Sequence, residues 1–151
     1  MQPLEFLPKH EYMQLALALA KEAAQCGEIP VGAVIEKDGI VIGTGRNRRE
    51  EKQNALWHAE IEAIHNACKY LKSWRLSDCR LYVTLSPCVM CAGAIVNARI
   101  DRVIYGEEDD KLPISALEVY QKENLGTVKI YRNFMQEECK TLLSDFFKKI
   151  R

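Results

Sequence analysis

A strand runs directly into a helix in the stretch RLYVTLSPCVMC, residues Arg80–Cys91. Its first half, Arg80–Leu85, is rich in β-branched and aromatic residues and predicts a strand. Ser86 is a good helix N-cap and Pro87 suits the first helical position, so the sequence predicts a helix over Cys88–Asn97. This junction indicates an α/β arrangement and places two cysteines, three residues apart, on one face of a helix.

The segments on either side continue the alternation of helices and strands. A helical hydrophobic period predicts three longer helices, at Glu11–Gln25, His58–Leu71 and Gln136–Lys149. The dipeptide Asp38-Gly39 is a strong hairpin signal between strands expected at Gly32–Lys37 and Ile40–Gly43. Shorter elements are expected as strands at Arg102–Tyr105 and Val128–Tyr131, a helix at Ile114–Tyr120, and charged loops at Arg46–Lys52 and Glu107–Lys111. The pattern predicts one α/β domain over residues 1–151, with a sheet covered by helices.

Composition is that of a globular protein without a strong overall charge. The chain has 151 residues, of which 48% are hydrophobic and 28% charged, and its 21 Lys and Arg balance 21 Asp and Glu. There is no global basic field to attract nucleic acid, although a local basic face would suffice. The segment Met1–His10 lacks a signal-peptide pattern and no apolar run reaches membrane length, so we expect a cytoplasmic protein that does not enter a membrane.

Two short motifs supply candidate metal ligands. His58 contributes an imidazole, Cys88 and Cys91 contribute two thiols, and Glu60 follows the histidine by two positions. Three protein ligands are typical of a catalytic zinc, which keeps its fourth position for water, and this donor set suits Zn²⁺. A zinc-dithiolate-imidazole site with an adjacent carboxylate predicts hydrolytic chemistry, because the metal acidifies water and Glu60 can carry the proton.

Other interpretations of these residues stay open. Cys88 and Cys91 could be buried thiols beside a surface histidine, or a redox dithiol after a strand, but the redox interpretation leaves His58 and Glu60 unexplained. The remaining cysteines are expected to be small buried hydrophobes: Cys26, Cys68, Cys79 and Cys139. The pattern His-x-Glu…Pro-Cys-x-x-Cys is itself a known signature of zinc deaminases acting on cytosine and adenine.

The chain resembles the bacterial tRNA adenosine deaminases over nearly its whole length. The segments that carry the resemblance are Glu28–Val34, His58–Ile61, Trp74–Leu76, Leu81–Ala94, Arg99–Ile100 and Leu142–Phe147. The resemblance implies a three-layer α/β/α cytidine-deaminase-like fold with a mixed five-stranded sheet, a homodimer, and one Zn²⁺ per chain. It also implies a zinc-dependent hydrolase that converts adenosine to inosine at the wobble position in a tRNA anticodon stem-loop.

The resemblance further assigns roles to single residues. It implies that His58, Cys88 and Cys91 bind zinc and that Glu60 is catalytic. Substrate-binding residues would be Asn47, which contacts the nucleoside, with Ile29, Pro30 and Val31 walling the base pocket and Ala59 reading the base through its backbone. A loop-capping amide at a strand end is the alternative for Asn47. Candidate RNA contacts are Asp109, Lys111 and four basic residues for which a solvated charged loop is the alternative, namely Arg46, Arg48, Arg49 and Lys52.

Two positions depart from the family pattern. Ser86 stands where the family has Glu, and after Lys111 the chain follows a shorter path that begins Leu112-Pro113-Ile114 instead of a Gly-rich segment. Two other functions therefore stay open beside a tRNA adenosine deaminase. One is a deaminase of a free base, nucleoside or nucleotide of the guanine or cytosine type, and the other is a non-catalytic zinc-stabilised subunit.

Overall fold

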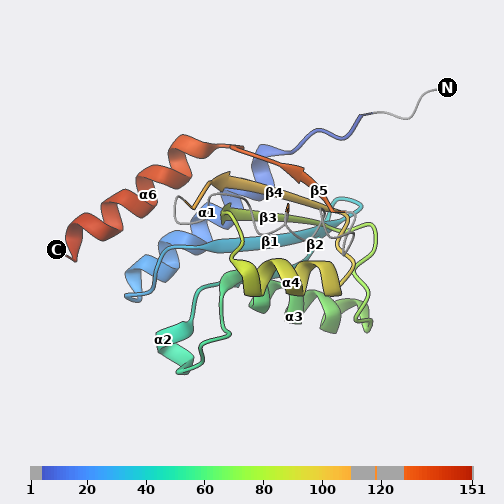
Figure 1. Ribbon diagram of the computed structural model, residues 1–151, viewed down its shortest axis with the longest axis horizontal. Coiled ribbons are helices and arrows are strands. Elements are labelled where there is room, and N and C mark those ends of the chain that lie inside the picture. The colour runs from blue at the N-terminus through green and yellow to red at the C-terminus, as the bar shows by residue number, and fades with distance from the viewer. Residues whose placement is uncertain (1–4, 110–117, 119–127, 151) are drawn as a thin grey trace.

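The computed structural model describes residues 5–109, 118 and 128–150. Five strands form one mixed sheet in the order β2-β1-β3-β4-β5 (Figure 1). Their bounds are β1 Gly32–Lys37, β2 Ile40–Arg46, β3 Arg80–Leu85, β4 Arg102–Glu107 and β5 Lys129–Tyr131. Strands β2, β1 and β3 pair antiparallel, whereas β3, β4 and β5 pair parallel. The expected hairpin is confirmed, with Asp38 and Gly39 both in the left-handed region that its turn requires (φ 52° and 82°).

Helices cover both faces of this sheet. Their bounds are α1 His10–Gln25, α2 Arg49–Lys52, α3 Ala59–Leu71, α4 Val89–Asn97 and α6 Gln136–Lys149. Helices α3 and α4 lie on one face, and α1 and α6 lie on the other (Figure 1). The α/β class and the three-layer arrangement expected from the sequence are confirmed.

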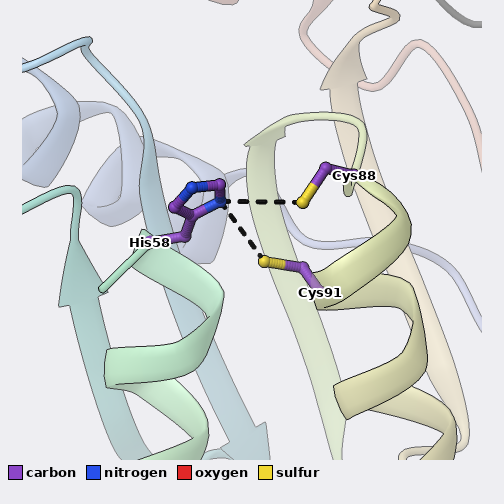
Figure 2. A group of neighbouring side chains, drawn as sticks. All are labelled: His58, Cys88 and Cys91. Atoms are coloured by element: carbon purple, nitrogen blue, oxygen red, sulfur yellow. Dashed lines mark hydrogen bonds between the residues drawn. The ribbon is translucent and has the colours of Figure 1, made fainter. Parts of the chain in front are cut away.

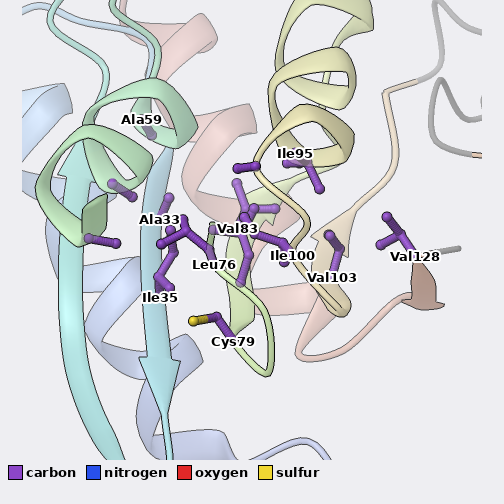
Figure 3. Close-up of a cluster of buried hydrophobic side chains, with 14 of the residues drawn as sticks. Ala33, Ile35, Ala59, Leu76, Cys79, Val83, Ile95, Ile100, Val103 and Val128 are labelled. Carbon is purple, nitrogen blue, oxygen red and sulfur yellow. The ribbon is translucent and has the colours of Figure 1, made fainter. Parts of the chain in front are cut away.

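Alternating side chains of the central strands fill two separate cores. On the α3 and α4 face, Ala33, Ile35 and Val83 pack with Ile95 and other buried residues (Figure 3). On the opposite face, the intervening residues, among them Val34 and Tyr82, pack against α1 and α6. Because β1, β3 and β4 are buried on both faces, they form nearly continuous apolar runs, as inner strands of such a fold do.

The start of α4 differs from the prediction. Ser86 does not cap the helix; Cys88 is the N-cap residue and the helix begins at Val89. The backbone N–H of Ser86 donates to the carbonyl of Glu107 (2.8 Å), and its hydroxyl accepts from the Asp109 backbone N–H (2.8 Å). These bonds extend the alignment of β3 with β4 past Leu85, so the chain turns into the helix later than local preferences indicate.

Other differences are confined to edges and loops. The charged loop expected at Arg46–Lys52 is instead the end of β2 followed by the short helix α2, and β4 extends two residues further than predicted, to Glu107. Cys79 and Cys139 are buried as expected, Cys68 is partly buried, and Cys26 is exposed at the end of α1, against the prediction. Of the helix expected at Ile114–Tyr120, only Glu118 lies within the described residues. Among the described residues, no helix combines the length and apolar character needed to cross a membrane.

Candidate active site

Three possible metal ligands meet where α3 and α4 begin. His58 is the N-cap residue of α3, Cys88 is the N-cap residue of α4, and Cys91 lies in the first turn of α4. The Nδ1 atom of His58 lies 3.7 Å from Sγ of Cys88 and 3.6 Å from Sγ of Cys91 (Figure 2). Residues separated by thirty positions in the sequence are therefore brought within contact distance by the packing of two helices on one sheet face.

These side chains could hold one metal ion. Their ligand atoms all lie within 4.8 Å of one another, and His58 and Cys88 are partly buried while Cys91 is buried. Tetrahedral coordination with usual zinc bond lengths would separate an imidazole nitrogen from a thiolate sulfur by about 3.5 Å. The two observed nitrogen–sulfur distances, 3.6 and 3.7 Å, are close to that value, so the donor set fits such an ion in both chemistry and spacing.

The pKa values of the candidate metal ligands are shifted in different directions. The hydrogen bond with Cys91 lowers the pKa of Cys88 to about 4, and the same bond raises the pKa of Cys91. The hydrogen bond with Cys88 raises the pKa of His58. One thiolate is thus present at neutral pH, and the second forms when a cation displaces its proton.

Glu60 lies in the first turn of α3 and is buried next to Cys91. Burial raises the pKa of Glu60 to about 7, because desolvation penalises the charged form. A carboxyl group with a pKa near neutrality can both accept and donate a proton at physiological pH. Its location beside the thiol cluster suits a proton carrier.

A pocket of about 140 Å³ opens directly over these residues. Its lining includes most of the predicted site, namely Ile29, Val31, Asn47, His58, Ala59, Glu60, Cys88 and Asp109. Pro30 is buried beside these residues but does not line the pocket. The structure therefore gathers the candidate metal ligands, the proton carrier and the candidate base-pocket residues around one cavity.

One candidate RNA contact is not placed as expected, and a second lies outside the described residues. Arg46 is buried, and its guanidinium pairs with Glu51 (3.0 Å) and Glu22 (3.6 Å), so it does not face an RNA ligand. Lys111 lies outside the described residues. Asp109, by contrast, lines the pocket and is only partly exposed.

Sequence reasoning missed several residues of the pocket and its support. Leu85 and Ser86 also line the cavity, as does Arg49, which the sequence offers as a candidate phosphate contact. Asn47 accepts a hydrogen bond at Oδ1 from the Arg49 backbone N–H (3.0 Å), which is the loop-capping role that a polar residue at a strand end can fill. Buried Glu28 accepts the backbone N–H groups of Glu50 and Glu51 at 3.0 and 2.8 Å. No local signal in the sequence links Glu28 to the helix that it caps.

A mixed α/β/α sandwich with a His/Cys/Cys group and a buried glutamate at two helix starts defines a nucleobase deaminase. Comparison with known proteins agrees. The family model of MafB19-like deaminases matches residues 7–151, and the chain belongs to this family. It is therefore an enzyme of the deaminase class, and the likeness to tRNA adenosine deaminases expected from the sequence is confirmed.

Individual relatives sharpen this assignment. The tRNA-specific adenosine deaminase of Bacillus subtilis (strain 168) is 41% identical, covering 93% of this chain and 89% of the relative. A solved structure from a study of A-to-I editing by tRNA:A34 deaminases at the wobble position is 38% identical, with a TM-score of 0.85. The match covers 89% of this chain and 100% of that structure's chain. The structure of guanine deaminase from Bacillus subtilis is 33% identical, with a TM-score of 0.64. The match covers 91% of this chain and 93% of that structure's chain.

Proposed function

We propose that this enzyme converts adenosine to inosine by hydrolysis at the wobble position of tRNA. The observation that carries the proposal is the pocket whose lining brings Asn47 together with His58, Glu60 and Cys88. The relatives support the substrate, because proteins of about 40% identity over nearly the whole chain are tRNA-specific adenosine deaminases. In the reaction, one water replaces the exocyclic amine of the purine, and the products are inosine and ammonia.

His58, Cys88 and Cys91 would hold one Zn²⁺, whose role when bound is to lower the pKa of a water ligand toward neutrality. Glu60 would take one proton from the attacking water and deliver it to the purine ring nitrogen, and it would then carry a second proton, from the hydroxyl that the attack adds, to the departing amine. The position of Glu60 next to the thiol cluster supports this role, as does the pKa of about 7 that burial gives it.

The walls of the pocket would orient the base. Ile29 and Val31 offer apolar surface, Asn47 offers an amide, and the backbone at Ala59 lies within the same lining. Pro30 would support this wall from behind. Asp109 would contact the RNA at the pocket edge, and Lys111 is proposed for the same role from the resemblance alone. An anticodon stem-loop as substrate, a homodimer as the working form and a cytoplasmic location complete the proposal.

A deaminase of a free base remains the alternative. The specific observation in its favour is the guanine deaminase at 33% identity, together with the balanced charge of 21 basic and 21 acidic residues. An enzyme for a free base needs no basic approach for RNA, whereas one that takes an extruded nucleotide also has to accommodate its neighbours.

One assay separates the two functions. Purified zinc-loaded enzyme is incubated with an anticodon stem-loop that carries adenosine at the wobble position, and inosine is measured. In parallel, ammonia release is measured from guanine, cytosine, adenine and their nucleosides. We expect inosine in the stem-loop; turnover of a free base with none of the stem-loop would reject the tRNA substrate. The Glu60→Gln variant serves as the chemical control, since it should bind zinc but lose turnover by at least about 10²-fold.

A further inference from the structure

One buried carboxylate connects both ends of the segment that leads from β2 to α3. Glu62 lies in α3, and its side chain accepts hydrogen bonds from three residues within the 46–57 segment. Arg48 Nε donates to both of its oxygens (3.0 and 2.7 Å), Trp57 Nε1 donates to Oε2 (2.7 Å), and the Arg46 backbone N–H donates to Oε1 (3.4 Å). The segment is closed further by the Arg48 backbone N–H, which donates to the carbonyl of Trp57 (3.0 Å).

The residues that Glu62 holds are the immediate neighbours of two site residues. Arg46 and Arg48 flank Asn47, and Trp57 directly precedes His58. Glu62 is also one helical turn after His58, and its backbone N–H donates to the His58 carbonyl (3.1 Å). A shift of this carboxylate would therefore move the amide of Asn47 and the imidazole of His58 relative to each other.

Both oxygens of Glu62 are committed to donors, so its charge cannot be replaced by a neutral amide of the same shape. Oε1 faces Arg46 N and Arg48 Nε, and Oε2 faces Arg48 Nε and Trp57 Nε1. In either orientation, the amide nitrogen of a glutamine would point at a donor. Part of the 46–57 segment would then have to move away to relieve the conflict.

We propose that Glu62 is a positioning residue of the active site, which fixes the base-pocket residue Asn47 and the metal ligand His58 at their working separation. The inference deepens the proposed function and rests on it for the roles of Asn47 and His58. Glu62 itself does not line the pocket. Its effect on the reaction is exerted through Arg48 and Trp57.

The chain supplies a matched control at a distance from the pocket. Glu36 is also buried and pairs with Arg80, and both of its oxygens are likewise committed: Arg80 Nε donates to Oε1, while Arg80 Nη2 (3.4 Å) and the Gly39 backbone N–H (3.0 Å) donate to Oε2. Glu36 lies near the hairpin turn and does not line the pocket. Glu36→Gln therefore breaks a comparable buried ion pair without touching residues 46–58.

The test compares Glu62→Gln with Glu36→Gln and wild type by melting temperature, by kcat and KM on the stem-loop, and by the visible spectrum and affinity of bound Co²⁺. Both variants should lose several degrees of melting temperature. Glu62→Gln alone should lose about 10- to 100-fold in kcat/KM, since a 1 Å misplacement costs about 10²-fold. It should also change the Co²⁺ spectrum and weaken Co²⁺ binding by about 10-fold.

Two results would overturn the role of Glu62. The first is a Glu62→Gln variant that matches Glu36→Gln in kcat/KM and in its Co²⁺ spectrum, which leaves Glu62 as a residue of stability only. The second is a Glu62→Gln variant with a raised KM and an unchanged Co²⁺ spectrum. Such a variant would have disturbed Asn47 but not His58, whereas the proposal requires that Glu62 holds both. Wild-type enzyme that makes no inosine would reject the proposed function instead, and the Co²⁺ comparison would still decide whether Glu62 positions His58.

Discussion

The approach of α3 to β2 yields a sharp prediction for Gly45. A Cβ atom at this position would lie 2.3 Å from the Ala59 carbonyl oxygen and 2.6 Å from the Ala63 backbone nitrogen. Ordinary contacts of a Cβ atom begin near 3.4 Å, so Gly45→Ala requires the first turn of α3 to retreat by about 1 Å. That turn carries Glu60 and follows His58 directly.

The expected cost has two parts. Overpacking of this kind destabilises a core by about 1–3 kcal/mol, which for a chain of this size lowers the melting temperature by roughly 2–12 °C. A displacement of about 1 Å in catalytic groups costs about 10²-fold in rate. Gly45→Ala should therefore fold with a lower melting temperature, and the folded enzyme should lose on the order of 10²-fold in kcat/KM.

Gly43→Ala is the matched control for this prediction. Its Cβ atom would meet the Ala63 carbonyl oxygen at 2.4 Å and the Ala67 nitrogen at 2.7 Å, which is the same conflict one helical turn further from His58. We expect a similar loss of melting temperature with a clearly smaller loss of activity. A Gly45→Ala enzyme with wild-type stability would refute the close packing of α3 on β2. Equal losses of activity in the two variants would refute the local displacement.

Further predictions concern the metal, α2 and the pocket edge. A Cys88→Ser, Cys91→Ser double variant should contain no zinc by metal analysis, whereas wild type should contain one ion per chain; retained zinc in the variant would place the ion elsewhere. Because the pKa values of Cys91 and His58 are raised, metal binding must release protons, so zinc affinity measured against a chelator should rise from pH 6 to pH 8, and a flat profile would contradict the ligand set. Glu28→Gln should weaken the capping of α2 by about 1 kcal/mol, seen as faster tryptic cleavage within residues 48–52, with unchanged cleavage as the contrary result. Arg49→Gln should weaken stem-loop binding and reduce the slope of log affinity against log salt by about 1. An unchanged slope would show that Arg49 makes no phosphate contact.

Local sequence patterns were sufficient where an element is specified by its own residues. Strands β1 and β3 and helix α6 have the predicted bounds. The signal for each lies in its own residues: a hairpin turn after β1, a β-rich composition in β3 and a helical period in α6. The start of α4 and the helix α2 could not be predicted in this way. Ser86 is held by Asp109 and Glu107 from another strand end, and α2 is capped by Glu28 from 22 residues away.

The same division separates what could and could not be predicted about the site. The donor set of His58, Cys88 and Cys91 follows from residue chemistry and spacing, and the structure brings the three together. Glu62 gave no signal, since a glutamate on an amphipathic helix is usually solvated. Its burial depends on Arg48 and Trp57, which approach it only after the 46–57 segment folds back onto α3.

The placement of the basic residues between β2 and α3 bears on the proposed RNA substrate. In the sequence, four basic residues of this stretch are candidate phosphate contacts: Arg46, Arg48, Arg49 and Lys52. In the structure, Arg46 pairs with Glu51 and Glu22, Arg48 pairs with Glu62 and Glu51, and Lys52 lies over the Trp57 ring at 5.1 Å. Arg49 is exposed and lines the pocket. Arg46 and Arg48 are held in internal ion pairs and Lys52 lies over Trp57, so under the proposed function this stretch would offer RNA few phosphate contacts, with Arg49 at the pocket. Binding through it should accordingly depend weakly on salt.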